Sequence, residues 1–149
     1  MEARTPMTRQ VIVIPPELPV DRAWALLRAH RIRHLPVVSG GKLMGIVSDR
    51  DLRLHATLEG DEPTFPGKIA AEVMTAALVT CQPETSVSDV VRRMTERKVD
   101  AIPVVDLEER LIGLVTTTDL LLLLIDWDEA KLPFDWELLD HSLASAAYA

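Results

Sequence analysis

Three short apolar runs, each bounded by proline, glycine or serine, predict strands in the first half of the chain. They cover residues 11–14, 35–38 and 43–47, and Ser39-Gly40-Gly41 predicts a hairpin turn between the last two. Apolar residues at helical spacing follow the first run and predict a helix through about residue 31. These residues are Val20, Ala23, Trp24 and Leu27. A second helix is expected from Asp49 to about Gly60, which gives the order strand–helix–strand–strand–helix.

The second half of the chain repeats this order. Its apolar runs cover residues 78–81, 102–105 and 111–115. A helical stripe lies between the first two runs and follows a capping pair, Ser86 and Asp89. The stripe consists of Val87, Val90, Val91 and Met94. A closing helix is expected from Thr117 to about Asp126, and the tail has the spacing of a short helix around residues 134–147.

Single residues repeat along with the elements. Met7-Thr8 and Pro36-Val37-Val38 return 67 residues later, and Gly45, Val47, Asp51 and Leu52 return 68 residues later. A long repeat that occurs only twice is not a solenoid, and it predicts two half-domains packed about a pseudo-twofold axis. Because about 60 residues are marginal alone, we expect the two halves to pack against each other. The order of strands and helices in each half predicts an α+β fold. The expected boundaries are 5–60 and 69–126 for the repeats, 61–68 for the linker and 127–149 for an acidic tail.

Composition narrows the class of protein. With 149 residues, of which 48% are hydrophobic, the chain is one compact domain or two halves sharing a core. The single cysteine, Cys81, excludes an internal disulfide framework and fits a reducing compartment. No basic-then-apolar leader opens the chain, and the longest apolar run, 120–125, is too short to span a bilayer. We therefore expect a cytoplasmic protein without a membrane partner.

The charge of the chain disfavours some ligands and favours others. A net charge of −7 disfavours general binding to nucleic acid. Residues 1–53 nevertheless carry nine Arg and Lys against five acids, whereas residues 126–140 carry six acids against Lys131. Phosphate groups therefore suit the first half better than the tail. The four histidines share no metal-ligand spacing, so no zinc site is expected.

One junction in each half is the strongest candidate for binding chemistry. A strand ends at Ser48 or Thr116, and a carboxylate follows three positions later, at Asp51 or Asp119. A carboxylate can accept two hydrogen bonds from the vicinal hydroxyls of a ribose, and the hydroxyl can donate to a sugar or phosphate oxygen. The alternative is a capping box that only satisfies helix N–H groups. Aspartate is shorter than the glutamate that capping boxes prefer, which favours the binding interpretation.

Each half resembles a cystathionine-β-synthase-type (CBS) domain, and the pair resembles a Bateman module. The first half carries the resemblance at Met7-Thr8 to Pro16-Glu17, at His34 to Val38 and at Gly45 to Asp51. The matching segments are Met74-Thr75 to Pro83-Glu84, Ala101 to Val105 and Gly113 to Asp119. Residues 31–38 and 45–53 further resemble acetoin-utilisation B-type proteins, although the chain has no room for the ACT extension that some of them have.

The resemblance implies ligands that contain adenosine, namely AMP, ADP, ATP or S-adenosylmethionine, in clefts between the halves. By position, Asp51 and Asp119 would hold ribose, and Ser48 and Thr116 would lie near ribose or phosphate. The residues implied along the base are His34, Leu35, Ala101 and Ile102, and Pro103 is a further implied ligand-binding residue. The resemblance also implies a homodimer that pairs through helices.

The two implied clefts are not equivalent. Thr80 lies where the family often has a threonine on its first strand, but the corresponding residue of the first half is Val13, which lacks a hydroxyl. Arg50 is placed to meet phosphates, or else is a solvated arginine, and the second half has Thr118 at that position. The first site therefore has a positive charge for phosphate that the second does not have.

The leading hypothesis is a regulatory adenine-nucleotide sensor that acts on a separate protein or through its own oligomer. The rival is a constitutive dimerisation or protein-interaction scaffold without a nucleotide ligand. An enzyme is not expected, because the chain has neither a P-loop nor a nucleophile elbow.

Overall fold

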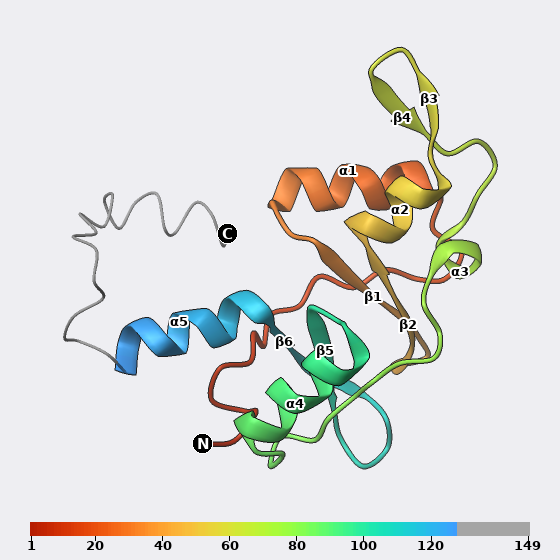
Figure 1. The fold of residues 1–149 in the computed structure, drawn as a ribbon. Helices are drawn as coiled ribbons and strands as arrows, with labels where there is room; N and C mark the ends of the chain where they lie inside the picture. The colour runs from red at the N-terminus through yellow and green to blue at the C-terminus, as the bar shows by residue number, and fades with distance from the viewer. Residues whose placement is uncertain (128–149) are drawn as a thin grey trace, which may run out of the picture.

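The computed structural model describes residues 1–127. The first half contains α1 (Val20–His30), β1 (His34–Ser39), β2 (Lys42–Ser48) and α2 (Asp49–His55). The second half contains α4 (Val87–Arg97), β5 (Ala101–Val105), β6 (Leu111–Thr116) and α5 (Thr117–Trp127). Between them lie β3 (Thr57–Glu59), β4 (Glu62–Thr64) and the short α3 (Ala70–Val73), as Figure 1 shows. The predicted tandem α+β fold is confirmed.

Both predicted hairpins form with matching registers. His34 lies opposite Ser48 in the first hairpin, and Ala101 lies opposite Thr116 in the second. Each hairpin has a register shift after its proline, between Val37 and Val38 or between residues 104 and 105. The two halves therefore place equivalent residues at equivalent points of equivalent sheets.

The first strand predicted in each half is reduced to a single bridge. Ile14 forms a parallel bridge with Val37, and Cys81 forms one with Val104. The predictions of strands over 11–14 and 78–81 were therefore wrong in extent. Prolines follow both bridges closely, at Pro15 and Pro83, and a proline has no N–H group with which to continue a ladder.

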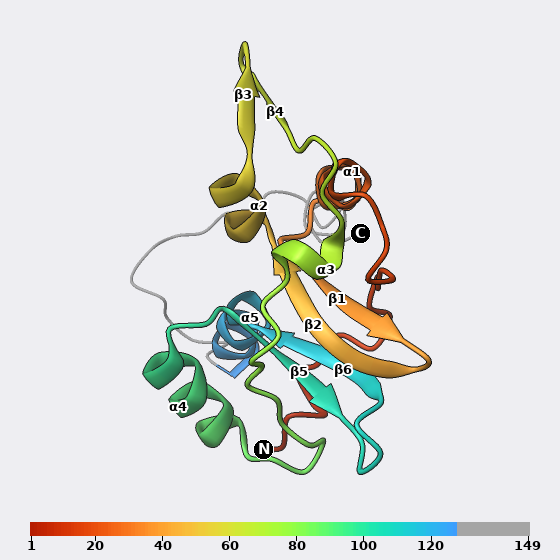
Figure 2. The ribbon, with the colours of Figure 1, turned by 90° about the vertical axis from the view of Figure 1, so that its right-hand side faces the viewer.

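The segment in front of each half pairs with the opposite half. Thr8 exchanges two backbone hydrogen bonds with Leu114, of 2.9 and 3.0 Å, and Thr75 exchanges two with Ile46, of 3.0 and 2.9 Å. Accordingly the N-terminus lies beside α4 of the second half, whereas α3 lies beside the first half (Figures 1 and 2). This crossed pairing ties the halves together through the main chain.

Each half has a hydrophobic core of its own. The first core consists of Ile14, Val20, Ala23, Leu27, Leu35, Val37, Val47, Leu52, Phe65, Ala70 and Val73. The second consists of Ala3, Met7, Cys81, Val90, Met94, Ile102, Val104 and Val115. Ala70 and Val73 thus belong to the first core, and Ala3 and Met7 belong to the second. Buried apolar area is the main favourable contribution to both.

The segment after α2 is more structured than the sequence indicates. The helix predicted to fade by Gly60 ends at His55, since Ala56 is already extended at φ −72° and ψ 143°. The β3–β4 hairpin then projects away from the rest of the molecule (Figure 2). Phe65 follows it and is 1% exposed, with its ring centroid 5.9 Å from that of Trp24. Trp24 is therefore packed at the edge of the first core.

None of the helices within residues 1–127 has the length and apolar character that crossing a bilayer requires. The helix predicted around residues 134–147 lies outside the described residues.

Candidate functional site

The open end of each hairpin brings the predicted site residues together. The β1–β2 register places His34 beside Ser48, and α2 begins at the next residue. The backbone N–H of Asp49 donates to the carbonyl oxygen of Arg33 at 2.9 Å, which fixes the helix start against the strand. In the second half, the backbone N–H of Thr117 donates to the carbonyl oxygen of Asp100 at the same distance of 2.9 Å. Each half thus forms one cluster of strand end and helix start.

Asp51 and Ser48 cap the start of α2. The Asp51 N–H donates to Ser48 Oγ at 3.0 Å, and the Ser48 N–H donates to Asp51 Oδ2 at 3.0 Å. These two bonds satisfy two N–H groups that the helix itself leaves without partners.

Asp119 and Thr116 form the same reciprocal pair. The Thr116 N–H donates to Asp119 Oδ2 at 2.7 Å, and the Asp119 N–H donates to Thr116 Oγ1 at 3.3 Å. The Thr116 hydroxyl also donates to Asp119 Oδ2, at 2.7 Å. Aspartate therefore reaches the capping position in both halves, and its shorter side chain does not favour the binding interpretation over the capping box as expected.

Capping uses only one oxygen of each carboxylate. Within residues 1–127, no hydrogen bond is found to Oδ1 of Asp51 or of Asp119. Both residues are half-buried, as are Ser48 and Thr116. Each cluster therefore keeps one carboxylate oxygen that can accept further hydrogen bonds.

The two clusters adjoin each other through Arg33. Its Nε lies 3.5 Å from Asp49 Oδ2, and its Nη2 lies 4.0 Å from Asp100 Oδ2. Arg33 and Asp100 occupy equivalent positions of the repeat, 67 residues apart, so the pair joins the two halves near their pseudo-twofold axis. The Arg33 side chain is 64% exposed, and such a pair contributes about 1 kcal/mol or less. Sequence reasoning missed Asp100. Its position in the repeat is equivalent to that of Arg33, and this opposite charge at an equivalent position was the signal that could have identified it.

His34 lies inside this group of charges. Burial of the imidazole, followed by the positive charge of Arg33, lowers its pKa below the usual value for histidine. The carboxylates of Asp49, Asp100 and Asp51 act in the opposite direction but do not outweigh them. The neutral imidazole is therefore favoured in the folded protein.

The remaining predicted residues differ in their accessibility. Arg50 and Thr118 are exposed, Val13 is 44% exposed, and Thr80 is half-buried. Leu35 and Ile102 are 0% exposed and belong to the two cores, and Pro103 and Ala101 are buried as well. The Thr80 carbonyl oxygen accepts a hydrogen bond of 2.7 Å from Arg93 Nη1, a residue that sequence reasoning did not single out.

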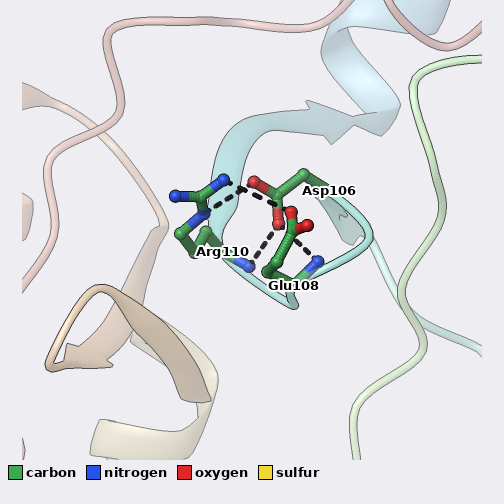
Figure 3. A network of polar contacts seen from close by, with 3 residues as sticks. All are labelled: Asp106, Glu108 and Arg110. Atoms are coloured by element: carbon green, nitrogen blue, oxygen red, sulfur yellow. Dashed lines mark hydrogen bonds and ion pairs between the residues drawn. The ribbon is translucent and has the colours of Figure 1, made fainter.

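A separate polar network stabilises the turn at the other end of the second hairpin. Arg110 Nε donates to Asp106 Oδ2 at 2.8 Å, and Asp106 Oδ1 accepts from the backbone N–H groups of Arg110 and Glu108 (Figure 3). The backbone bond from Arg110 is the main cause that lowers the pKa of Asp106. The Leu43 N–H donates to Glu109 in this turn, at 3.3 Å, so the turn contacts the first hairpin. It lies away from the helix starts and has a structural role.

Two cavities lie beside the clusters. One, of about 440 Å³, includes Asp49 and lies between α1, α2 and the β4 hairpin strand. The other, of about 930 Å³, includes Asp100 and Thr117 and lies between α4 and α5. Neither of these two cavities includes Asp51 or Asp119.

A sequence model of the CBS domain matches residues 3–56 and 70–126, which include both hairpins and both capped helix starts. The chain belongs to the CBS domain family. One relative of this CBS protein, the CBS domain-containing protein YhcV of Bacillus subtilis, is 33% identical over 114 residues, which are 76% of this chain and 79% of YhcV. The inosine-5'-monophosphate dehydrogenase of Thermoplasma acidophilum is 30% identical over 117 residues, 78% of this chain but 22% of that enzyme.

Solved CBS structures share the fold. The CBS domain pair of protein MJ0100, in complex with 5'-methylthioadenosine and S-adenosyl-L-methionine, has a TM-score of 0.75 and 26% identity, over 86% of this chain and 98% of that one. CBSX2 in complex with AMP has a TM-score of 0.76 and 26% identity, over 85% of this chain and 97% of CBSX2. The acetoin utilization protein AcuB from Vibrio cholerae has a TM-score of 0.74 and 26% identity, over 87% of this chain and 95% of AcuB. The resemblance stated from the sequence is confirmed.

Proposed function

We propose that this CBS domain pair binds an adenosine-containing nucleotide at its two helix starts and acts as a regulatory module without catalysis. One observation carries the proposal. Asp51 and Asp119 each keep one carboxylate oxygen without a hydrogen bond from residues 1–127, at a half-buried position beside a hydroxyl side chain. The vicinal hydroxyls of a ribose are donors that such a carboxylate accepts, and a bond to an ionised acceptor is stronger than a neutral one.

Neighbouring residues supply the other contacts in this proposal. The exposed guanidinium groups of Arg33 and Arg50 meet phosphate, and Ser48 and Thr116 donate to sugar or phosphate oxygens. Because the side chains of Leu35 and Ile102 are fully buried, contacts to the base from these positions come from main-chain atoms. The second half has neither arginine at the equivalent positions, so the first site binds phosphate more strongly.

The solved relatives support this ligand class. The MJ0100 pair and CBSX2 are complexes with 5'-methylthioadenosine, S-adenosyl-L-methionine or AMP, and all three contain adenosine. We therefore place AMP, ADP, ATP and S-adenosylmethionine as the ligands to test on this chain.

Regulation in this proposal works through differential binding. A ligand that contacts both halves favours one arrangement of them over another, and the change alters a contact with a second copy or with a separate regulated protein. The proposal places the protein in the cytoplasm as a homodimer. It needs no covalent chemistry.

A thermal-shift panel tests the ligand class. Protein freed of ligand by unfolding and refolding is melted with millimolar AMP, ADP, ATP or S-adenosylmethionine, with inorganic phosphate as the control. A ligand at about 100 times its Kd adds about 2.7 kcal/mol to the free energy of unfolding. The proposal predicts a rise in Tm with at least one adenosine compound and none with phosphate. An unchanged Tm with every compound contradicts it.

A constitutive interaction scaffold is the second candidate function. It is favoured by the capping bonds, since Asp51 and Asp119 already have a structural role that explains their presence. A scaffold keeps its dimer and its partners when both aspartates are replaced, whereas a sensor loses ligand binding.

A further inference from the structure

The residue in front of each hairpin has opposite charge in the two halves. Arg33 and Asp100 occupy equivalent positions of the repeat. The carbonyl oxygen of Arg33 accepts the N–H of Asp49, and that of Asp100 accepts the N–H of Thr117, so each residue is fixed against the first residue of a helix. Both side chains therefore begin at matching points beside the two helix starts, and one of them is a cation where the other is an anion.

The difference in charge extends over the whole helix start. In the first half two arginines balance two aspartates at the positions concerned, which are Arg33, Asp49, Arg50 and Asp51. In the second half the equivalent positions hold two aspartates and two threonines, namely Asp100, Thr117, Thr118 and Asp119. His34 adds no charge to the first group, because its neutral form is favoured in the folded protein. By this count the first helix start is neutral and the second carries −2.

Arg33 offsets the negative charge of Asp100 only in part. Its guanidinium is shared, since Nε lies 3.5 Å from Asp49 Oδ2 and Nη2 lies 4.0 Å from Asp100 Oδ2. The side chains of Arg33 and Asp100 are 64% and 60% exposed, so water and salt weaken the pair further. Arg31 and Lys98 do not alter the comparison, because they are cations at equivalent positions, each in the left-handed conformation that ends a helix. The second helix start therefore keeps an excess of negative charge.

Both aspartates of the second half are tied to neighbouring main-chain groups. Asp119 Oδ2 accepts from the Thr116 N–H at 2.7 Å, and the next N–H, of Thr117, donates to the Asp100 carbonyl oxygen at 2.9 Å. A ribose bound by Asp119 carries its 5' substituent on the same ring as its vicinal hydroxyls. A phosphate monoester there has a charge of roughly −1.5 to −2 at pH 7. It would therefore be brought close to two carboxylates, and like charges held together disfavour binding.

We propose that Asp100 excludes phosphate from the second helix start, so that the two sites of the module take different ligands. The first site, beside Arg33 and Arg50, binds an adenosine compound with a 5'-phosphate. The second binds one whose 5' substituent is uncharged or cationic, such as 5'-methylthioadenosine or the sulfonium compound S-adenosylmethionine. This inference rests on the proposed function, because it requires that Asp119 holds a ribose. Asp100 acts on specificity by repelling the wrong ligand.

Calorimetric titration of ligand-free Asp51→Asn protein isolates the second site, because this variant weakens the ribose contact of the first. The probes are AMP and 5'-methylthioadenosine, which differ only in the 5' substituent. We expect 5'-methylthioadenosine to bind at least about tenfold more tightly than AMP. The ratio of the two affinities should shrink as the salt concentration rises from about 0.1 M to about 1 M, because salt screens the repulsion.

Two further variants on the Asp51→Asn background assign this ratio to Asp100. Asp100→Asn removes one charge from an exposed side chain and should reduce the ratio at least about fivefold. Glu108→Gln is the matched control. It removes the same charge from a side chain that is also exposed, in the turn at the other end of the second hairpin (Figure 3), and should leave the ratio unchanged.

A charge exchange between the halves completes the test. Arg33→Asp combined with Asp100→Arg keeps the net charge and an opposite pair between the halves, and on the Asp51→Asn background it should make AMP the tighter ligand. If neither probe binds to the parent protein, nor any other adenosine compound, the proposed function and this inference fail together. If the parent binds but Asp51→Asn does not, or if Asp100→Asn leaves the ratio unchanged, the proposed function stands and this inference alone is wrong.

Discussion

Gly45 lies so close to Met74 that a Cβ atom on the glycine would stand 2.6 Å from the Met74 sulfur. The equivalent pair in the repeat is Gly113 and Met7, at 2.7 Å. Each methionine precedes one half and packs on the glycine of the other. The repeated Met-Thr and glycine landmarks of the sequence are therefore contact partners, and their repetition follows from the crossed pairing of the two halves.

Replacement of Gly113 by alanine tests this contact. The added Cβ meets both Met7 Sδ, at 2.7 Å, and the main-chain oxygen of Thr8, at 3.1 Å, so part of the clash cannot be relieved by a side-chain rotation. Gly113→Ala is expected to lower the free energy of unfolding by about 1–3 kcal/mol in urea denaturation. Adding Met7→Ala relieves the sulfur contact, so the double variant loses less than the sum of the single changes. Strict additivity would contradict the account.

The elements that the sequence predicts well are those that its local pattern determines. The helices α1 and α4 follow from apolar stripes, and both hairpins follow from short runs around a turn. The crossed pairing does not follow from any local pattern, because Met7 and Gly113 are distant in sequence. The β3–β4 hairpin was missed for a related reason: all three residues of β3 are exposed, so no apolar alternation marks it.

The composition of the candidate site was predictable, but its side-chain arrangement was not. The repeat identifies Ser48 and Asp51, and the hairpin register then places His34 beside them. Whether the carboxylate caps its own helix depends on a side-chain torsion that sequence cannot give, and both interpretations use the same residue types. In the structure the capping bonds form, and the ribose contact remains a proposal.

The capping bonds predict a difference between two neighbouring threonines. Thr116 accepts from the Asp119 N–H, whereas Thr118 is an exposed residue of the first turn of α5. Thr116→Ala is expected to lower the free energy of unfolding by about 1 kcal/mol, within a range of roughly 0.5–2 kcal/mol. Thr118→Ala, as the matched control, should change it by less than about 0.5 kcal/mol. Equal losses in urea titrations would show that the hydroxyl at position 116 does not cap.

The lowered pKa of His34 predicts a pH dependence of stability. Since burial favours the neutral imidazole, the unfolded chain binds a proton at a higher pH than the folded chain does. The contribution of His34 to the free energy of unfolding is therefore fully present above the ordinary histidine pKa. It falls as the pH drops from about 7.5 through about 6.5 toward the pKa of His34 in the folded protein. His34→Gln should flatten this decline in Tm between pH 7.5 and 5.5. An identical slope for parent and variant would mean that the pKa of His34 is the same in the folded and the unfolded chain, which contradicts the account.

Calorimetric titration of the ligand-free protein tests the central claim, that the repeated aspartates bind ribose as well as cap helices. The isosteric variants Asp51→Asn and Asp119→Asn keep an oxygen that can accept the capping bond but lose the charge. Asp89→Asn is the control, because Asp89 also lies three residues after a hydroxyl N-cap, accepts from the Ser86 hydroxyl and donates its N–H to Ser86 Oγ at the start of α4, outside both clusters. With the adenosine compound that gives the largest thermal shift, the account predicts binding to the parent and to Asp89→Asn, and at least tenfold weaker binding, about 1.4 kcal/mol, when both site aspartates are replaced. Equal affinity for all of these proteins, or no binding to the parent, would contradict it.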